Sequence, residues 1–345
     1  MRYGAAADSP PEWIAFKMGL VPLPILDTVI GPIQARAFIA SERLGLFEAL
    51  ADGPQRAEDL ARARGLDPEC TALVLRVVRA MGYVELSGGR FSLSKLGEAH
   101  FGKTAREPYR AFVEYGLPQW EMVARLEDVM KSGAGIDFHD HHTKDEWDSY
   151  QRAMVENARG FGWFVAKHLP VPTGATTCLD IAGAHGLVGA LVCRAHPGLR
   201  STVLDRAEAL PRARQIAESL GHTDVVGFRE ADLRTDDFGR DVDVALLCNI
   251  LHHFPASENV AILKRLKKAM KPGGSVGIFD IETPSDDATP DAAGDAFALY
   301  FRITSTSTCF RGDDYVTWLR EAGFADAKVI RSVKMPSRML VVGKA

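Results

Sequence analysis

The stretch LDIAGAHG, Leu179 to Gly186, decides the fold because it joins a short apolar run to a turn of small residues. From residue 176 onward, apolar runs of strand length alternate with segments of helical spacing. This alternation, with short connections, predicts an α/β fold with a doubly wound, mainly parallel sheet. Ligands of such sheets bind at the carboxyl ends of the strands. The turn that follows Leu179 is therefore a predicted ligand-binding edge.

The composition is that of an ordinary globular protein. A chain of 345 residues favours two domains over a single core. Its 46% hydrophobic and 25% charged residues lie in the usual range. A net charge of −4 gives no electrostatic footprint for nucleic acid or for an acidic membrane surface. We therefore expect neither nucleic acid nor membrane as a partner.

The cysteines and the N-terminus indicate a cytoplasmic protein. The cysteines are odd in number, widely spaced and without a CxxC pair, which favours free thiols over disulfides or a zinc site. They are Cys70, Cys178, Cys193, Cys248 and Cys309. The start, MRYGAAADSPPEW, lacks the basic and apolar regions of a secretory signal. No uninterrupted apolar run reaches about 18 residues, so no membrane span is expected.

Residues 1–100 are predicted to form a helical domain that ends in a two-stranded wing. Arg56 to Arg64 has the pattern of a short helix, with Gly65 as its C-cap. Asp67 is a predicted N-cap, with Pro68 at the first position of a helix that runs to Met81. The segment YVEL-SGG-RFSL then predicts a hairpin around a Gly-Gly turn. This order is that of a winged helix.

A winged helix commonly binds DNA, but the segment in the recognition position, PECTALVLRVVRAM, is mostly aliphatic. Only Arg76 and Arg79 could meet phosphate, and the segment has no Asn or Gln to contact a base edge. Packing or dimerisation is therefore favoured over DNA contact. A winged-helix regulator with a sensory domain remains an alternative.

Residues 101–168 are predicted to be a helical linker that lines a substrate pocket, before a catalytic domain at 169–345. The linker is interrupted by SGAGIDFHDHHTKDEW, in which residues 139–142 are of metal-ligand types. Adjacent loop residues rarely converge on one ion, so a solvated linker is favoured and no metal is predicted. In the next helical segment, Met154 and Phe161 could line the pocket or simply pack in the core.

Acidic residues follow three successive predicted strands. Asp180 opens the turn, and Asp205 ends the next strand 25 residues later. An acid in the position of Asp205 can accept both ribose hydroxyls of a nucleotide. Asp232 follows the third strand beside Leu233, where a carboxylate could receive an adenine amino group while the aliphatic side chain covers the ring.

The turn itself is not one that binds phosphate. It has neither the Gly-Lys-Ser/Thr of a P-loop nor the GxGxxG of a dinucleotide loop. The spacing D-x-A-x-A-x-G, with Gly183 between the alanines, resembles the D-x-G-x-G-x-G turn of class I S-adenosylmethionine-dependent methyltransferases. Alanine is tolerated where φ is negative and fails where φ is positive, and we expect the alanines to leave room for the cofactor.

With these acids and the motifs HHF and KPGG in register, residues 33–345 resemble a family of small-molecule O-methyltransferases. The family includes plant caffeate-type enzymes, hydroxyindole O-methyltransferase, and bacterial polyketide and phenazine tailoring enzymes. The matching segments are ASERLGLFEALADGP, LDIAGAHG and LLCNILHHFPASENVAILKRLKKAMKPGG. The resemblance implies an N-terminal winged-helix dimerisation domain, a Rossmann-like catalytic domain, S-adenosylmethionine as cofactor, and a homodimer.

The resemblance also implies roles for particular residues. His252 matches the general base, Asp280 matches an acid that orients it, and His253 stands beside them. The positions that match cofactor contacts are Asp180, Ala182, Gly183, Gly186, Asp205, Arg206, Asp232, Leu233 and Cys248.

Three features depart from the family pattern. Ala182 and Ala184 replace turn glycines, His253 stands where an acid is frequent, and Cys309 corresponds to a second orienting Glu.

The chemistry implied is displacement at a sulfonium methyl by an oxyanion. A phenol has a pKa of about 10, so a base helps at neutral pH, and an imidazole with a pKa of about 6.5 suits that task. We therefore predict that His252 removes the acceptor proton and that Asp280 holds its tautomer. The alternatives are that His252 caps the strand, that His253 is structural, and that Asp280 is a solvated carboxylate.

The acceptor is predicted to be a phenol or enol of a small secondary metabolite. The segment DAFALYFRITSTSTCF offers an aromatic and hydroxyl lining suited to a planar molecule, with core packing as the alternative. Its candidate residues are Phe297, Tyr300, Phe301 and Thr304. Two other reactions stay open with the same fold and cofactor: methylation of nitrogen or carbon, and a rearrangement assisted by the sulfonium without methyl transfer.

Overall fold

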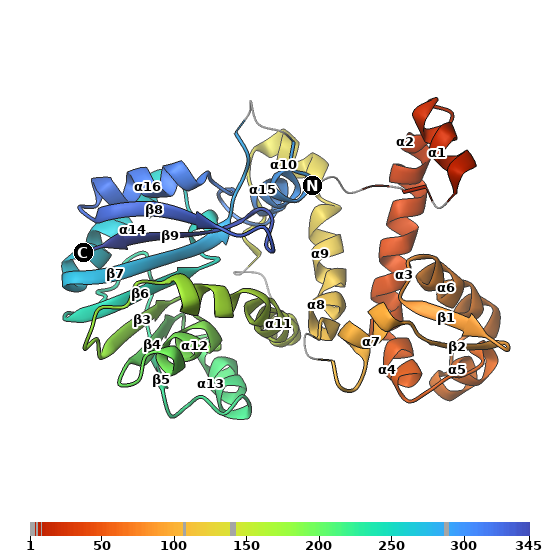
Figure 1. Ribbon diagram of the computed structural model, residues 1–345, viewed down its shortest axis with the longest axis horizontal. Coiled ribbons are helices and arrows are strands. Elements are labelled where there is room, and N and C mark those ends of the chain that lie inside the picture. The colour runs from red at the N-terminus through yellow and green to blue at the C-terminus, as the bar shows by residue number, and fades with distance from the viewer. Residues whose placement is uncertain (1–3, 5, 8, 106–107, 139–142, 286–289) are drawn as a thin grey trace. The chain divides into compact units, whose positions relative to one another are not determined.

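A computed structural model describes residues 4, 6–7, 9–105, 108–138, 143–285 and 290–345 (Figure 1). The chain divides into two compact units, residues 3–117 and residues 118–345. The boundary falls inside the segment 101–168 that the sequence indicated as a linker. Residues 118–168 therefore belong to the same unit as the sheet.

The N-terminal unit is helical and carries one hairpin. Its elements are α1 (Pro10–Lys17), α2 (Leu23–Ile25), the π-helical η1 (Leu26–Ile30), α3 (Gly31–Arg43), α4 (Leu46–Ala51), α5 (Ala57–Arg64), α6 (Pro68–Ala80), β1 (Val84–Ser87), β2 (Arg90–Leu93), α7 (Lys95–Phe101) and α8 (Arg110–Glu114). The predicted order of helix, turn, helix and wing is present in α5, α6 and the hairpin β1–β2. Asp67 caps α6 as predicted, since its side chain accepts a hydrogen bond from the backbone N–H of Cys70 at 2.7 Å.

The predicted Gly-Gly turn of the wing is also confirmed. Gly88 and Gly89 have φ of 56° and 75°, left-handed values that a two-residue hairpin turn of this twist requires. Ser87 and Arg90 pair across the turn. Within this unit α6 packs through one face only: Leu75 and Val78 are fully buried.

The α2–α3 region bears on the expectation that the chain has no membrane span. Among the described residues, the helical stretch Leu23–Arg43 is long and apolar enough to cross a membrane, by length and composition alone. The sequence indicated no such segment, because Asp27 and Arg36 interrupt its apolar run.

The C-terminal unit contains a seven-stranded sheet of order β5-β4-β3-β6-β7-β9-β8, and this confirms the predicted doubly wound α/β fold. Its strands are β3 (Thr177–Ile181), β4 (Arg200–Asp205), β5 (Val226–Glu230), β6 (Val242–Cys248), β7 (Met270–Ile281), β8 (Ala325–Arg331) and β9 (Arg338–Lys344). The strands from β5 to β7 run parallel, whereas β9 is antiparallel to both β7 and β8. The strand order reverses at β3, which is where such sheets bind ligands.

The helices that follow α8 in the chain are α9 (Gly116–Val123), α10 (Leu126–Ser132), α11 (Lys144–His168), α12 (Leu187–Ala195), α13 (Leu210–Ser219), the 3₁₀ turn η3 (Leu251–His253), α14 (Ala256–Ala269), α15 (Ala292–Thr304) and α16 (Gly312–Glu321). Of these, α14 and α16 cover one face of the sheet, and α11 and α12 cover the other (Figure 1). One core lies against α14 and α16, with Leu263 and Leu319 fully buried. The other lies against α11 and α12, with Val165 and Val192 fully buried. Burial on both faces explains why the central strands are continuously apolar.

Asp243 joins the starting ends of three strands. Its Oδ2 accepts hydrogen bonds from the backbone N–H groups of Thr176 and Thr177 at 2.9 and 3.0 Å, and its Oδ1 accepts one from Lys271 at 2.8 Å. Lys271 belongs to the KPGG motif, which lies in β7. Burial alone would raise the pKa of Asp243, but the hydrogen bonds from Lys271 and the two threonines outweigh it and hold the pKa below its usual range.

We predict that Asp243→Asn lowers the free energy of unfolding by about 1–3 kcal/mol at pH 7, because charge-assisted hydrogen bonds are lost. A carboxylate whose pKa is depressed in the folded state stabilises above the unfolded pKa of about 3.9, and this contribution is lost as the pH falls below it. Urea unfolding between pH 7 and pH 3 should therefore show the gap between wild type and variant closing in acid. The exposed Asp241→Asn is the matched control, and a gap that is independent of pH would contradict the assignment.

Candidate active site

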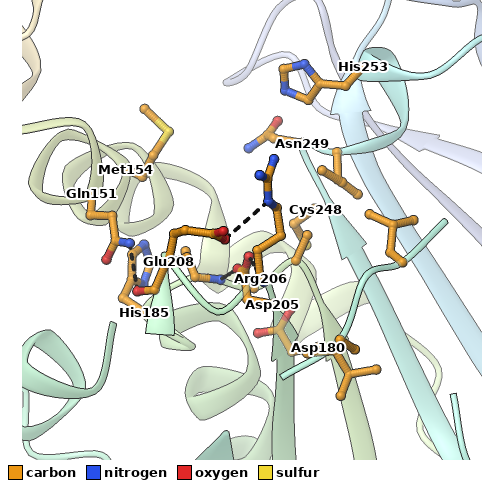
Figure 2. A pocket seen from close by; sticks show the side chains of 18 of the residues that line it. Gln151, Met154, Asp180, His185, Asp205, Arg206, Glu208, Cys248, Asn249 and His253 are labelled. Atoms are coloured by element: carbon orange, nitrogen blue, oxygen red, sulfur yellow. Dashed lines mark hydrogen bonds and ion pairs between the residues drawn. The ribbon is translucent and has the colours of Figure 1, made fainter. Parts of the chain in front are cut away.

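A cavity of about 520 Å³ lies at the carboxyl ends of β3, β4, β5 and β6. Its walls come from residues 182–185 after β3, residues 205–209 at the end of β4, residues 230–234 after β5, residues 248–250 after β6, and one face of α11. Figure 2 shows Asp180 and Asp205 toward one end of the cavity and Asn249 and His253 toward the other, with Met154 and Gln151 on α11. The cavity is therefore at the edge of the sheet that the sequence indicated.

The turn after β3 has an unexpected backbone. Ala182 and Ala184 have φ of 54° and 45°, the left-handed region that was expected to exclude alanine. The expectation that alanine occupies these two positions at negative φ was wrong. The amide of Ala182 donates to the carbonyl of Leu204 at 2.7 Å, and that of Ala184 donates to Oδ2 of Asp205 at 2.9 Å. These two bonds hold both alanines in a conformation that glycine would adopt without strain.

Position 183 requires glycine because a side chain would clash there, and not because the backbone needs a positive φ. A Cβ at this position would lie 2.4 Å from Cγ of Asp180, which real side chains do not tolerate. Gly186 does have a left-handed φ, of 69°, and it precedes α12 directly. The two alanines and the two glycines of the motif thus meet different physical requirements.

Asp180 is buried and serves both the fold and the cavity. Its Oδ2 accepts a hydrogen bond from the backbone N–H of Gly189 in the first turn of α12, at 3.1 Å. Its Oδ1 has no hydrogen-bond partner within the described part of the chain. Burial raises the pKa of Asp180 to about 7, although the bond from Gly189 opposes this. A buried carboxylate oxygen at a cavity wall is a position for a hydrogen-bond donor or a cation.

The next acid shapes the turn as well. Oδ1 of Asp205 accepts from the backbone N–H of Arg206 at 2.9 Å, and Oδ2 accepts from Ala184, so each oxygen keeps a lone pair for a ligand. Burial raises the pKa of Asp205, and the two N–H donors act against that effect. Arg206 lines the cavity and forms an ion pair with Glu208 at 3.5 Å (Figure 2).

The remaining predicted cofactor positions also line the cavity. Asp232 is exposed, and its Oδ1 accepts from the backbone N–H of Arg234 at 2.8 Å. Leu233 lies beside it and packs against the sheet core. Cys248 ends β6 at the cavity wall, where burial raises the pKa of its thiol well above the usual value.

Acidic side chains outnumber basic ones in the cavity. Of the described residues, seven with a carboxyl group line it, against the two guanidinium groups of Arg206 and Arg234. The carboxylates are those of Asp137, Asp180, Asp205, Glu208, Glu230, Asp232 and Asp236. Such a lining attracts a cationic ligand and repels phosphate.

The face of α11 supplies most of the residues that the sequence analysis missed. Met154 and Phe161 line the cavity as candidates, but they are part of a longer stripe. Its members are Trp147, Tyr150, Gln151, Met154, Asn157, Ala158 and Phe161. The spacing is helical, so the stripe was visible in the sequence, but polar Gln151 and Asn157 within it were not recognised. His185 and Asn249 were also missed, although both lie next to predicted positions.

The two histidines of η3 occupy different places. His252 is 1% exposed and is not among the cavity-lining residues, whereas His253 is. Nδ1 of His252 lies 2.5 Å from Oδ1 of Asp280, and its Nε2 lies 3.1 Å from Nε2 of His253. The acid, the buried histidine and the cavity histidine therefore form one hydrogen-bonded chain.

Asp280 is held by further donors. The hydroxyl of Tyr315 donates to its Oδ2 at 2.9 Å, and the backbone N–H of Ile281 donates to its Oδ1 at 2.8 Å. Cys309 is buried, and burial together with the charge of Asp280 raises the pKa of its thiol. Tyr315 contacts Asp280 and not His252.

The α15 candidates do not line this cavity. Phe301 stacks on the ring of His252, with centroids 3.6 Å apart, and so fixes the orientation of that imidazole. Phe297 packs under the guanidinium of Arg338. The hydroxyl of Thr304 donates to the carbonyl of Tyr300 at 2.9 Å, inside the helix. The role of these four side chains in a substrate pocket stays a prediction.

No metal site is found among the described residues. The histidine-rich residues 139–142, which the sequence analysis considered as ligands, lie outside the described residues.

Comparison with known proteins identifies the family to which this chain belongs. The model of the O-methyltransferase domain matches residues 121–325. The tetracenomycin polyketide synthesis 8-O-methyltransferase of Streptomyces glaucescens is 29% identical over 322 residues, which cover 88% of this chain and 91% of that one. The 3-hydroxy-5-methyl-1-naphthoate 3-O-methyltransferase of Streptomyces sahachiroi is 24% identical and covers 99% of both chains.

The fold has relatives among solved structures. Human N-acetylserotonin methyltransferase, solved in complex with S-adenosylmethionine, superposes with a TM-score of 0.81 at 18% identity, covering 99% of each chain. This likeness extends over both units of the chain.

We predict that Ala182→Gly and Ala184→Gly each raise the free energy of unfolding by about 0.5–1 kcal/mol. The left-handed conformation costs an L-residue about 1–2 kcal/mol, and the extra entropy of unfolded glycine offsets part of that gain. Urea unfolding measures the change. Gly183→Ala is the opposite test, since its Cβ meets the Asp180 carboxylate, and it should destabilise the protein. Destabilisation by both glycine variants would show that the alanines are unstrained.

Proposed function

Because the chain belongs to the O-methyltransferase domain family, we propose that it methylates a phenolic or enolic hydroxyl of a small secondary metabolite, with His252 as the general base. The chain is an S-adenosylmethionine-dependent methyltransferase. The observation that carries the proposal is the placement of the buried Asp280–His252 pair directly behind a cavity wall that is lined by acids at successive strand ends.

The residues of the cavity fit the cofactor. The Oδ1 of Asp180 needs a donor or cation, and the carboxylate of Asp205 has lone pairs for ribose hydroxyls. Asp232 and Leu233 would hold the adenine edge and face, and Cys248 would lie against the ring or sugar. The excess of carboxylates suits a ligand that carries a sulfonium and an ammonium.

When bound, the cofactor supplies a methyl group activated by positive sulfur. The chain has to orient an acceptor oxygen in line with it and remove the proton of that oxygen. Asp280 can only accept hydrogen bonds as a carboxylate, so it fixes the Nδ1–H tautomer of His252 and leaves Nε2 basic. Tyr315 and Ile281 keep Asp280 in place.

The acceptor class follows from the wall formed by α11. Trp147, Tyr150 and Phe161 offer flat apolar surface, and Gln151 and Asn157 offer polar contacts. The names of the two Streptomyces relatives include a polyketide and a hydroxynaphthoate, which supports a planar aromatic acceptor.

We predict that His252→Asn lowers kcat by about 100-fold or more, the usual contribution of a general base. The amide nitrogen of Asn can still donate to Asp280, so the S-adenosylmethionine Kd should stay unchanged. Labelled-methyl turnover against a panel of phenols, with product mass, measures the rate and identifies the methylated atom. His196→Asn, on the far end of α12, is the control. Undiminished turnover in His252→Asn, or a product methylated at nitrogen or carbon, would refute the proposal.

The proposal includes a cytoplasmic homodimer formed through the N-terminal helices. Large apolar side chains on α1, α2, η1 and α3, and on the segment between α1 and α2, are exposed, and exposed apolar clusters commonly mark an interaction surface. They include Trp13, Ile14, Met18, Leu20, Ile25, Val29, Ile30 and Ile33. A second copy of the chain would cover this surface, and Leu23–Arg43 would then act in assembly and not in a membrane.

We predict that the full chain has twice the mass of one protomer in light scattering after size exclusion. Ile33 is 52% exposed, and Ile33→Glu would bury a charge in the interface and shift the species toward the monomer. Ala35→Glu adds the same charge on the other side of α3 and should remain dimeric. A monomeric wild type, or equal behaviour of the two variants, would exclude this interface.

A further inference from the structure

The paired histidines of η3 differ in their access to the cavity. His253 lines the cavity, next to Asn249 and Ile250, whereas His252 lies behind it. Figure 2 shows the His253 ring at the end of the cavity, above Asn249. A substrate in the cavity therefore meets His253 before it could reach His252.

The hydrogen bonds set the tautomers of both rings. Asp280 accepts from Tyr315, Ile281 and Nδ1 of His252, the pattern of an ionised carboxylate. With its proton on Nδ1, neutral His252 has a lone pair on Nε2. The Nε2 of His253, 3.1 Å away, must then be the donor. Neutral His253 consequently carries its lone pair on Nδ1.

We propose that the acceptor hydroxyl binds at Nδ1 of His253. When His253 takes the hydroxyl proton, it passes its own Nε2 proton on to His252, so that the positive charge ends on His252. As the oxygen–methyl bond forms, the methyl–sulfur bond breaks and its electron pair stays on sulfur. Nδ1 of His253 takes the hydroxyl proton, and the proton on its Nε2 passes to Nε2 of His252. His253 ends neutral in the other tautomer, and His252 ends as an imidazolium beside Asp280. This relay rests on the methyl transfer proposed above.

The surroundings favour a positive charge on His252 over one on His253. Asp280 is fully buried and contacts His252 directly, so their attraction is little screened. Among the described residues, the titratable groups whose pKa is raised by burial and also by the charge of Asp280 are Tyr315, Cys309 and Cys248. Both effects keep all three neutral near pH 7. Asp137 also lines the cavity, and it precedes Phe138, whose ring centroid lies 6.1 Å from that of His253.

Both rings are held for the transfer. Phe301 stacks on His252, and it also meets the ring of His253 edge to face at 5.4 Å. The backbone of His253 is fixed at both ends: its N–H donates to the carbonyl of Ile250 at 3.1 Å, and its carbonyl accepts from the hydroxyl of Thr306 at 2.9 Å. In this scheme His253 is the catalytic residue, and His252 and Asp280 are positioning residues that take up the charge.

The kinetic test uses His253→Gln. A glutamine amide can still donate to Nε2 of His252, but it has no basic nitrogen. We expect kcat at pH 7 to fall by about 100-fold or more, as for a lost general base. The loss should vanish at a pH above the acceptor pKa, where the hydroxyl is already ionised. The double variant with His252→Asn should be no slower than either single variant, because the two rings act as a unit.

The second test does not depend on turnover. Nitrogen NMR of ¹⁵N-histidine-labelled protein, assigned with the two variants, reports which nitrogen of each ring carries a proton. The relay requires Nδ1–H on His252 and Nε2–H on His253 at pH 7. A proton on Nδ1 of His253 would overturn it, and so would a turnover in His253→Gln that equals wild type. If the wild type transfers no methyl group to any hydroxyl, the proposed function fails first, whatever the tautomers. His196→Gln is the control in both tests.

Discussion

The carboxylate of Asp180 is the group around which the ligand-binding edge is built. It accepts the amide of Gly189 and so fixes the start of α12 against β3. The same carboxylate excludes any side chain at Gly183, which forces the turn to pass close over it. Asp205 then holds the far side of the turn through Ala184. Two acids on adjacent parallel strands thereby shape the backbone that they also leave open to a ligand.

The cavity and the histidine chain behind it have opposite electrostatic designs. The cavity carries many partly solvated carboxylates, which draw in a positively charged ligand. Behind it a single buried carboxylate, Asp280, faces a single imidazole and is saturated by its donors. The first arrangement selects what enters, and the second determines where a proton can go. The short segment η3 connects the two, because His253 lines the cavity and His252 contacts Asp280.

Much of the fold followed from the sequence because it depends on local patterns. Strand–helix alternation, the Asp67 cap and the Gly-Gly wing are local, and the structure contains them. The acids at strand ends were found because parallel strands place their carboxyl ends together. The pocket role of the α15 side chains stays a prediction, because helical spacing identifies a face of the helix but not what that face packs against. The polar members of the α11 stripe were missed for a related reason, since Gln151 and Asn157 look like solvent positions until the cavity is known. The left-handed alanines could not be anticipated, because the bonds that hold them come from β4.

Cys248 places a nucleophilic atom in the wall of a cavity that fits a methylating agent. A protein that stores a methylating agent must protect its own nucleophiles from alkylation. A thiolate is the nucleophilic form of cysteine, and Cys248 stands at the wall of the cavity. Burial and the nearby charges of Asp180 and Asp280 keep this sulfur protonated. One acid of the cavity and one behind it therefore also keep this thiol in its unreactive form.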